Sequence, residues 1–249
     1  MLKTIDFGET DRILTLLTRH FGKVSVVAKG IRKPTSRLAG HAEPLTHATY
    51  QLARGRNLDV LTGAESRALY RALREDLYGI AAGWYIAELA DRFALERSPS
   101  APLFDLVESA LRHLAAGYAP ALVCRWFDLH LLDRTGFRPE LGQCVQCRAR
   151  PAEITNAWIV DAGGVVCATC APTDTQGPRA LTVRALKSLR YLLVSNFDGA
   201  SLLRVDEALA VELERHLRSF LQHVLDREIH AARLLDELAR MPRPAPAIT

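Results

Sequence analysis

The sequence predicts an α+β protein in which a small N-terminal β-barrel precedes an α-helical domain that carries a four-cysteine insertion. Three observations support this class. Short apolar runs separated by turn residues occupy residues 1–65, helical periodicity replaces them from residue 66, and two C-x-x-C pairs lie between the later helices. The predicted domains are 1–65 for the barrel, 66–142 together with 173–240 for the helices, and 143–172 for the insertion.

The barrel is predicted from its strand pattern. Apolar runs at 13–17 and 24–27 flank turn residues and predict a β-hairpin. Alternating side chains predict further strands at 46–52 and 57–61, and the second of these is expected to end at Gly63. Short strands with basic loops fit the OB-fold, a barrel that binds nucleic-acid strands with cationic grooves and stacking surfaces.

Positive charge is concentrated in the N-terminal third. Residues 1–78 carry 13 Lys and Arg against 8 Asp and Glu, and residues 12–42 contain no acidic residue. This pattern favours a polyanionic partner, with a solvated basic face as the alternative. The cations predicted to contact a nucleic-acid backbone are Arg12, Lys23, Lys29, Arg32, Lys33, Arg37, Arg54 and Arg56. The residues available to stack on bases, or alternatively to pack in the barrel, are Phe21, His20, His41, His47 and Tyr50.

From Ser66 onward, apolar residues recur at the three- and four-residue spacing of amphipathic helices. Gly79 and Gly83 are candidates for a break in the first helix, whereas Pro120 suits the first turn of a later helix and Gly136 its C-terminal cap. Further helices are predicted over 104–114, from Thr182 to 193, and from about 205 through His230. Residues 241–249 contain three prolines and are expected to form a disordered tail.

Two cysteine pairs give the most specific local signal. Cys144-Val145-Gln146-Cys147 and Cys167-Ala168-Thr169-Cys170 are separated by 19 residues. Two residues between thiolates let one tight turn present both sulfurs to a metal ion, and two such turns complete a tetrahedron. The spacing predicts a structural zinc site formed by Cys144, Cys147, Cys167 and Cys170, with redox dithiols or an iron–sulfur cluster as alternatives. Four protein ligands leave no position for water, so the metal is expected to order the insertion.

Other reactive side chains give weaker signals. Cys124 has no nearby partner and is expected to be a buried, inert thiol. His216, His223 and His230 recur every seven residues on the predicted last helix. Seven residues span about 10.5 Å of helix, too far for one metal ion, so we interpret them as packing residues. The sequence lacks a P-loop, a dinucleotide-binding glycine motif and a nucleophile elbow, and we expect neither enzymatic activity nor a small-molecule substrate.

The expected location is the cytoplasm. The sequence has no uncharged apolar stretch of membrane-spanning length, and its first residues do not have the pattern of a signal peptide. In that compartment thiols stay reduced, which favours metal binding over disulfide formation for the paired cysteines.

Several short motifs occur in a recognisable order. In the N-terminal third they are Gly8-Glu9-Thr10-Asp11-Arg12, Val27-Ala28-Lys29-Gly30-Ile31-Arg32-Lys33, Ser36-Arg37-Leu38-Ala39-Gly40 and Glu43-Pro44. Farther on they are Pro120-Ala121-Leu122, Gly136-Phe137, the two cysteine pairs and Gly163-Gly164-Val165-Val166-Cys167. The pattern resembles the RecO family, bacterial recombination mediators of the RecFOR pathway. There are two departures: few residues precede Gly8, so the first strand should be short, and Arg148 follows Cys147 where glycine is common.

The resemblance implies an N-terminal OB-fold, a helical domain and, in many members, a zinc-binding insertion. It implies binding of single- and double-stranded DNA and strand annealing without nucleotide hydrolysis, in association with the nucleoid. The implied partners are RecR and the acidic C-terminal tail of single-stranded DNA-binding protein (SSB), on whose DNA a recombinase is loaded. By similarity, Arg125, beside Leu122 and Trp126, matches a position that contacts the SSB tail, with a solvated helix residue as the alternative. A zinc-ribbon adaptor that binds RNA or proteins is the competing function.

Overall fold

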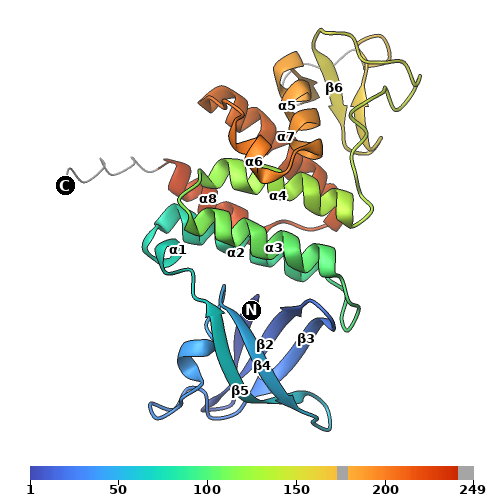
Figure 1. The fold of residues 1–249 in the computed structure, drawn as a ribbon. Helices are drawn as coiled ribbons and strands as arrows, with labels where there is room; N and C mark the ends of the chain where they lie inside the picture. The colour runs from blue at the N-terminus through green and yellow to red at the C-terminus, as the bar shows by residue number, and fades with distance from the viewer. Residues whose placement is uncertain (173–178, 241–249) are drawn as a thin grey trace, which may run out of the picture. The chain divides into compact units, whose positions relative to one another are not determined.

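The computed structural model describes residues 1–172 and 179–240, so the tail expected at 241–249 lies outside the described residues. The chain forms two compact units, one of Met1–Gly117 with the segment that starts at Ile229, the other of Tyr118–Glu228. Strands come first and helices follow, which confirms the α+β class (Figure 1). Within the described residues, every helix is too short or too polar to span a lipid bilayer.

The N-terminal sheet has the strand order β1-β2-β3-β5-β4 (Figure 1). Its strands are β1 (Lys3–Phe7), β2 (Asp11–Thr18), β3 (Gly22–Ala28), β4 (His47–Ala53) and β5 (Asp59–Ala68). Neighbouring strands are antiparallel except β3 and β5, which run parallel. The backbone N–H of Leu45 donates to the carbonyl of Met1 at 3.0 Å, which draws the two sheet edges together. This is an OB-like sheet that curls toward a partly open barrel.

Alternation along β2 and β3 fills the inside of this sheet. Val24, Val26 and Ala28 are buried on one face of β3 and pack with Leu14 and Leu16 of β2. The prediction that the fifth strand ends at Gly63 is wrong, because β5 continues to Ala68. Gly63 lies opposite Gln51 beside an irregularity in the register, where an added Cβ would approach the Gln51 side chain to 2.6 Å. Glycine therefore allows close pairing here and does not end the strand.

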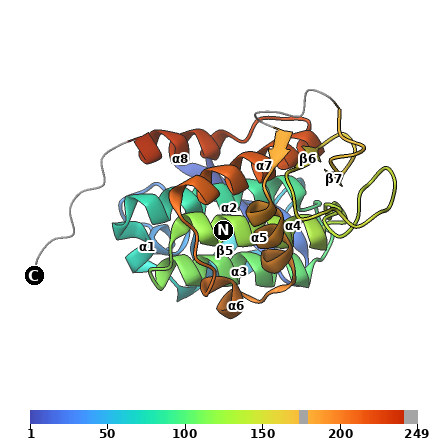
Figure 2. The same ribbon diagram turned by 90° about the horizontal axis from the view of Figure 1, so that it is seen from above.

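The described part of the N-terminal unit also contains a 3₁₀ helix at Ala39–His41 and the α-helices α1 (Arg71–Glu75), α2 (Leu77–Phe93), α3 (Ala101–Ala115) and α8 (His230–Arg240). Helix α2 contacts α3, and α8 lies along α2 (Figure 2). The break expected at Gly79 or Gly83 falls instead at Asp76, whose carboxylate caps α2 by accepting from the N–H groups of Tyr78 and Gly79. A Cβ at Gly83 would lie 2.7 Å from Cδ1 of Leu45, so this glycine lets α2 approach the barrel closely.

The second unit contains α4 (Pro120–Arg134), α5 (Val183–Val194), α6 (Phe197–Ser201) and α7 (Glu207–Leu225). Its sheet has the order β7-β6-β8, with β6 at Asn156–Ile159, β7 at Gly164–Val166 and β8 at Ala180–Leu181. Pro120 occupies the first turn of α4 and Thr182 caps α5, both as predicted. The prediction of one long last helix from about 205 through His230 is wrong. Asp226 adopts a left-handed conformation (φ 49°) that ends α7, and His230 begins a separate helix, α8, which belongs to the other unit.

Candidate nucleic-acid interface and metal centre

Two separated motifs fix the start of the basic loop, residues 29–37. Asp11 Oδ1 accepts hydrogen bonds from Gly30 N–H at 2.7 Å and from the Thr10 hydroxyl at 3.1 Å. The Arg32 N–H donates to the Thr10 carbonyl at 2.9 Å. Ile31 is 3% exposed and packs in the barrel core. The loop is therefore held at its base, and its exposed cations are carried by a rigid support.

The cations of this loop differ in their partners. Lys29, Lys33 and Arg37 are exposed, and none of them forms an ion pair within the described residues. Arg32 and Arg12 share the carboxylate of Asp6, at 3.4 Å from Arg32 Nη1 and 3.0 Å from Arg12 Nε. Phosphates that bind here would therefore compete with Asp6 for two of the five cations.

The carboxylate of Asp11 stays ionised beneath the loop. The hydrogen bond from Gly30 lowers the pKa of Asp11, and the charges of Lys29 and Lys33 act in the same direction, against a smaller opposing effect of desolvation. An ionised Asp11 accepts the Gly30 hydrogen bond more strongly than a neutral one. Sequence reasoning identified Asp11 only as part of a motif, because its partner is 19 residues away.

The other three predicted cations lie elsewhere on the barrel. In the pairing of β2 with β3, Arg12 lies opposite Ala28 and Lys23 lies opposite Leu17. Lys23 is therefore five residues, or about 17 Å along the strand, from Ala28, which directly precedes the basic loop. Lys23 Nζ donates to the Asp91 carbonyl at 2.6 Å and lies 3.4 Å from its carboxylate, which ties β3 to α2. Arg54 and Arg56 are exposed in the turn between β4 and β5. The structure thus groups five of the eight predicted cations near the basic loop and separates three from them.

A cavity of about 1010 Å³ lies in the N-terminal unit between the barrel and helices α2 and α3. Arg54 lines it, together with Arg19 and Arg97, which sequence reasoning did not select. Four of the five predicted stacking residues also line it: His20, Phe21, His47 and Tyr50. The ring of His47 already packs edge-on against Phe104, at 5.6 Å between centroids.

Tyr50 and His41 have partners within the barrel. The Tyr50 hydroxyl donates to the His41 carbonyl at 3.2 Å, and His41 Nδ1 lies 2.8 Å from the Ser66 hydroxyl. Burial raises the pKa of Tyr50 to about 12. Phe21, by contrast, is 69% exposed in the β2–β3 turn. The ring of Phe21 is therefore open to solvent.

The four predicted ligands converge at one point of the second unit. The sulfurs of Cys144, Cys147, Cys167 and Cys170 all lie within 4.8 Å of one another. A tetrahedral ion with metal–sulfur bonds of about 2.3 Å requires sulfurs roughly 3.8 Å apart. The distance between Cys147 Sγ and Cys167 Sγ is 3.7 Å. The cluster therefore has the spacing that a metal ion requires.

Backbone amides prepare one of these thiols for ionisation. Burial opposes ionisation of Cys144, but hydrogen bonds from the backbone of Cys147, Cys167 and Gln146 outweigh it and lower the pKa of Cys144 to about 6. Neighbouring sulfurs have the opposite effect on Cys170, whose pKa they raise to about 12. A divalent cation at the centre would offset that repulsion, so the donor set fits a soft metal ion.

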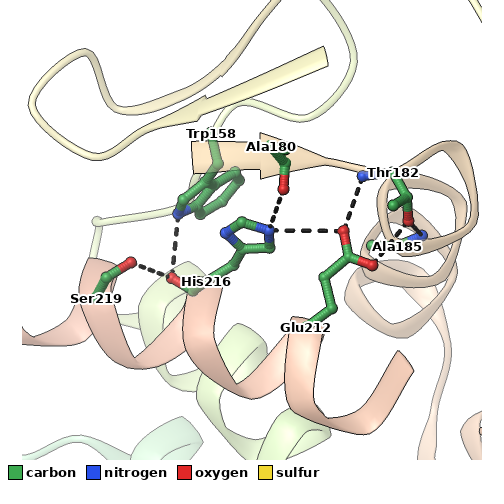
Figure 3. Close-up of polar contacts among 7 residues, drawn as sticks. All are labelled: Trp158, Ala180, Thr182, Ala185, Glu212, His216 and Ser219. Carbon is green, nitrogen blue, oxygen red and sulfur yellow. Dashed lines mark hydrogen bonds and ion pairs between the residues drawn. The ribbon is translucent and has the colours of Figure 1, made fainter. Parts of the chain in front are cut away.

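Hydrogen bonds join the insertion and its sheet to helices α5 and α7 (Figure 3), and the residues that form them are Trp158, His216 and Glu212. Trp158 Nε1 of β6 donates to the His216 carbonyl at 3.1 Å, and His216 Nε2 lies 3.0 Å from the Ala180 carbonyl of β8. Glu212 accepts from both the N–H and the hydroxyl of Thr182, at 2.8 Å each. The sequence indicated packing roles for His216, His223 and His230. His216 is fully buried, whereas His223 and His230 are exposed, so that interpretation is right for His216 alone.

The residues predicted to contact the SSB tail all lie on α4, and two of the three are buried. Arg125 is 6% exposed and its Nε lies 3.2 Å from Asp128 Oδ2. Trp126 is 4% exposed and donates to the Ser195 carbonyl at 3.1 Å. Leu122 is half-buried. Cys124 is also buried, as predicted, and burial raises its pKa to about 12, which makes it a poor nucleophile.

Comparison with known proteins identifies the family. Residues 1–70 match the model described as "Recombination protein O N terminal", and residues 74–233 match "Recombination protein O C terminal". The chain belongs to the RecO family. It is 39% identical over 243 residues to the "DNA repair protein RecO" of Roseiflexus sp. (strain RS-1), covering 98% of this chain and 85% of that protein. RecO proteins of the same name from Dehalococcoides mccartyi (strain ATCC BAA-2266 / KCTC 15142 / 195) and Desulforamulus reducens are 34% and 35% identical, and the matches cover 94% and 96% of this chain.

RecO membership confirms the resemblance read from the motifs and supports a role in DNA repair and recombination. The two matched ranges together span the barrel, the cysteine insertion and the helices through α7. The basic loop and the cysteine cluster are thus both parts of a RecO-type chain.

Proposed function

We propose that this chain is a recombination mediator that binds single- and double-stranded DNA and anneals complementary strands without nucleotide hydrolysis. With RecR it would help to load a recombinase onto SSB-coated DNA, in the cytoplasm and in association with the nucleoid. The observation that carries the proposal is the basic loop, in which exposed Lys29, Lys33 and Arg37 have no internal ion pair in the described chain and stand on an anchored base.

Strand pairing follows from charge neutralisation. Two DNA strands repel each other through their phosphates, and cations that replace condensed counterions reduce this repulsion. A base that enters the cavity would meet a lining that includes Phe21, Arg19 and Arg54, a combination that suits sequence-independent contact with single strands. Backbone contact of this kind leaves the base edges available for pairing with a complementary strand.

The deciding experiment measures annealing of SSB-coated complementary strands, together with DNA affinity as a function of salt. A variant that replaces Lys29, Arg32, Lys33 and Arg37 by alanine should lose most annealing. Its log–log salt slope for single-stranded DNA should fall by about 3, since each lost phosphate contact removes roughly 0.7. A matched control removes four exposed cations of the helical unit: Arg184, Arg204, Arg215 and Arg227. Unchanged annealing by the loop variant would refute the proposal.

The competing function, a zinc-ribbon adaptor for RNA or proteins, is separated in the same assay. Equal or tighter binding of RNA, with no annealing of DNA strands, would favour the adaptor. Support for DNA comes from the family, because relatives of this chain carry the name "DNA repair protein RecO".

For the SSB tail we propose contact with the region of Leu122, Arg125 and Trp126. A cation beside apolar side chains suits an acidic peptide that ends in a hydrophobic residue. Because Arg125 is buried and paired with Asp128, tail binding requires the start of α4 to open locally. Tail-peptide affinity should therefore be measured for Leu122→Ala as well as Arg125→Ala, with unfolding curves for both; normal binding by two folded variants would exclude this contact.

We propose zinc as the metal of the cysteine cluster, with Cys144, Cys147, Cys167 and Cys170 as its ligands. Bound zinc would supply structural cross-linking and no open coordination position. The apolar cluster of the insertion is small, and its buried members include Cys144 and Cys167 themselves. Metal content measured on purified protein, at one equivalent for the wild type and less for Cys170→Ser, tests the assignment.

A further inference from the structure

Arg148 has a backbone conformation that its side chain does not favour. It follows Cys147 in the first cysteine turn with φ 64°, in the left-handed region that glycine adopts without cost. Its N–H donates to the Cys144 carbonyl at 2.9 Å, so the conformation is built into the turn. The side chain is exposed and forms no ion pair in the described chain. Among the described residues, the side chain of Arg148 therefore has no ion pair that would explain an arginine at this position.

Two further arginines lie in the same region. Arg150 is exposed two residues later, and Arg190 of α5 donates from Nε to the Leu141 carbonyl at 2.7 Å. Arg190 Nη2 is buried without a hydrogen-bond partner among the described residues. Burial first, and then the charge of Arg150, lower the pKa of Arg190.

The nearby carboxylates already have other partners. Glu140 precedes Leu141, whose carbonyl accepts the hydrogen bond from Arg190. The carboxylate oxygens of Glu140 already accept from Gly142 N–H at 2.7 Å and from the N–H and side-chain amide of Gln143 at 3.2 Å each. Glu153, an acid that the charge of Arg150 influences, is paired with Lys187 at 2.9 Å. A zinc ion held by four thiolates would itself carry a net charge of −2, so what this turn offers a phosphate is two exposed guanidinium groups without ion pairs in the described chain, and not a net positive field.

We infer that this turn is a second binding site for the phosphate backbone of single-stranded DNA, with Arg148 and Arg150 as the contacting residues and Arg190 as the supporting charge. Guanidinium groups bind phosphate oxygens through paired N–H donors, which suits an exposed pair two residues apart. The inference rests on the proposed function and deepens it. One strand would bind at the basic loop and another at the cysteine turn, so that a single molecule holds both strands of a future duplex.

The test uses full-length, metal-loaded protein. The double variant R148G/R150Q should bind a labelled single strand with a salt slope lower by about 1.4, the loss of two contacts at roughly 0.7 each. Its annealing rate should fall, and the number of strands bound per protein should drop from two to one. Thermal stability should stay equal or rise, because glycine suits the left-handed position. The matched control is R184A, which removes an exposed cation that is already paired with Asp206 on the same unit.

Three outcomes are decisive. If wild type binds DNA and the double variant matches R184A in slope, stoichiometry and annealing, the second site does not exist. If wild type does not bind single-stranded DNA, the proposed function itself fails. Should R148G release metal, R148N in the same background decides the question, because asparagine tolerates the left-handed region and is also uncharged; full DNA binding by that metal-loaded variant would overturn the inference.

Discussion

Gly164 offers a sharp test of how the insertion holds its metal ligands. Glycines 163 and 164 are adjacent in one turn, but a Cβ at Gly164 would lie 2.2 Å from the Glu140 carbonyl oxygen, whereas a Cβ at Gly163 would meet no atom within 4 Å. The substitution Gly164→Ala must therefore push the strand β7 and the segment that leads to Cys144 apart. Gly163→Ala leaves that contact intact and is the matched control.

The magnitudes separate the two variants. For Gly163, with φ 85°, alanine costs only backbone strain, about 1 kcal/mol. For Gly164, overpacking adds about 1–3 kcal/mol. Separation would also weaken the hydrogen bonds Val165 N–H to Glu140 carbonyl at 2.9 Å and Glu140 N–H to Gly163 carbonyl at 3.0 Å, each worth about 1 kcal/mol. The expected difference of about 3 kcal/mol corresponds to roughly 100-fold in metal affinity.

Competition against a chromogenic chelator, read as metal released per protein, measures that affinity. We expect Gly163→Ala to stay within a few-fold of wild type and Gly164→Ala to release its metal far more readily. In denaturant unfolding of the full-length protein, Gly164→Ala should lower the midpoint for the second unit more than Gly163→Ala does. Equal affinities for the two variants would show that the Glu140–Gly164 contact does not position the cysteines.

Three further outcomes are expected. Asp6→Asn removes the acid shared by Arg12 and Arg32, so DNA affinity at low salt should rise and the salt slope should steepen; weaker binding would contradict the competition between Asp6 and phosphate. Burial, and then the charge of Arg215, lower the pKa of His216 to about 4. As the pH falls, His216 is therefore protonated in the unfolded chain before it is protonated in the folded protein. Wild-type stability should thus decline below pH 6.5 by up to about 1.4 kcal/mol per pH unit, and His216→Gln should show a flatter pH profile in denaturant titrations. Arg125→Ala leaves the buried Asp128 carboxylate without its cation and should cost about 3–5 kcal/mol in unfolding experiments, with partial recovery in the double variant Arg125→Met/Asp128→Leu.

Local patterns predicted the parts of this fold that depend on local chemistry. The β2–β3 hairpin, the caps at Pro120 and Thr182 and the two cysteine turns each need only a few neighbouring residues. Gly79 and Gly83 misled the interpretation because a glycine that breaks an isolated helix also allows close packing. Only the position of Leu45 against α2 distinguishes the two roles.

The candidate site depended more on contacts between distant residues. Composition identified the basic segment, but register was needed to separate Lys23 from the loop cations and to show its contact with Asp91. Arg125 could not be placed from periodicity, since α4 is buried almost all round and has no clear polar face to compare. The left-handed φ of Arg148 gave physical meaning to a departure from the family pattern that sequence alone only recorded.

All five cysteines of the chain lie at or after position 124, and four of them form the sulfur cluster of the second unit. Peroxide or hypochlorite attacks thiolates first, and oxidised sulfurs would no longer bind a metal ion. Oxidation of thiols would therefore disrupt the insertion that carries Arg148 and Arg150, whereas the barrel contains no thiol to oxidise. The oxidised protein would still bind one DNA strand at the basic loop but would not bind a second strand at the cysteine turn. Oxidation would therefore stop strand annealing without stopping DNA binding.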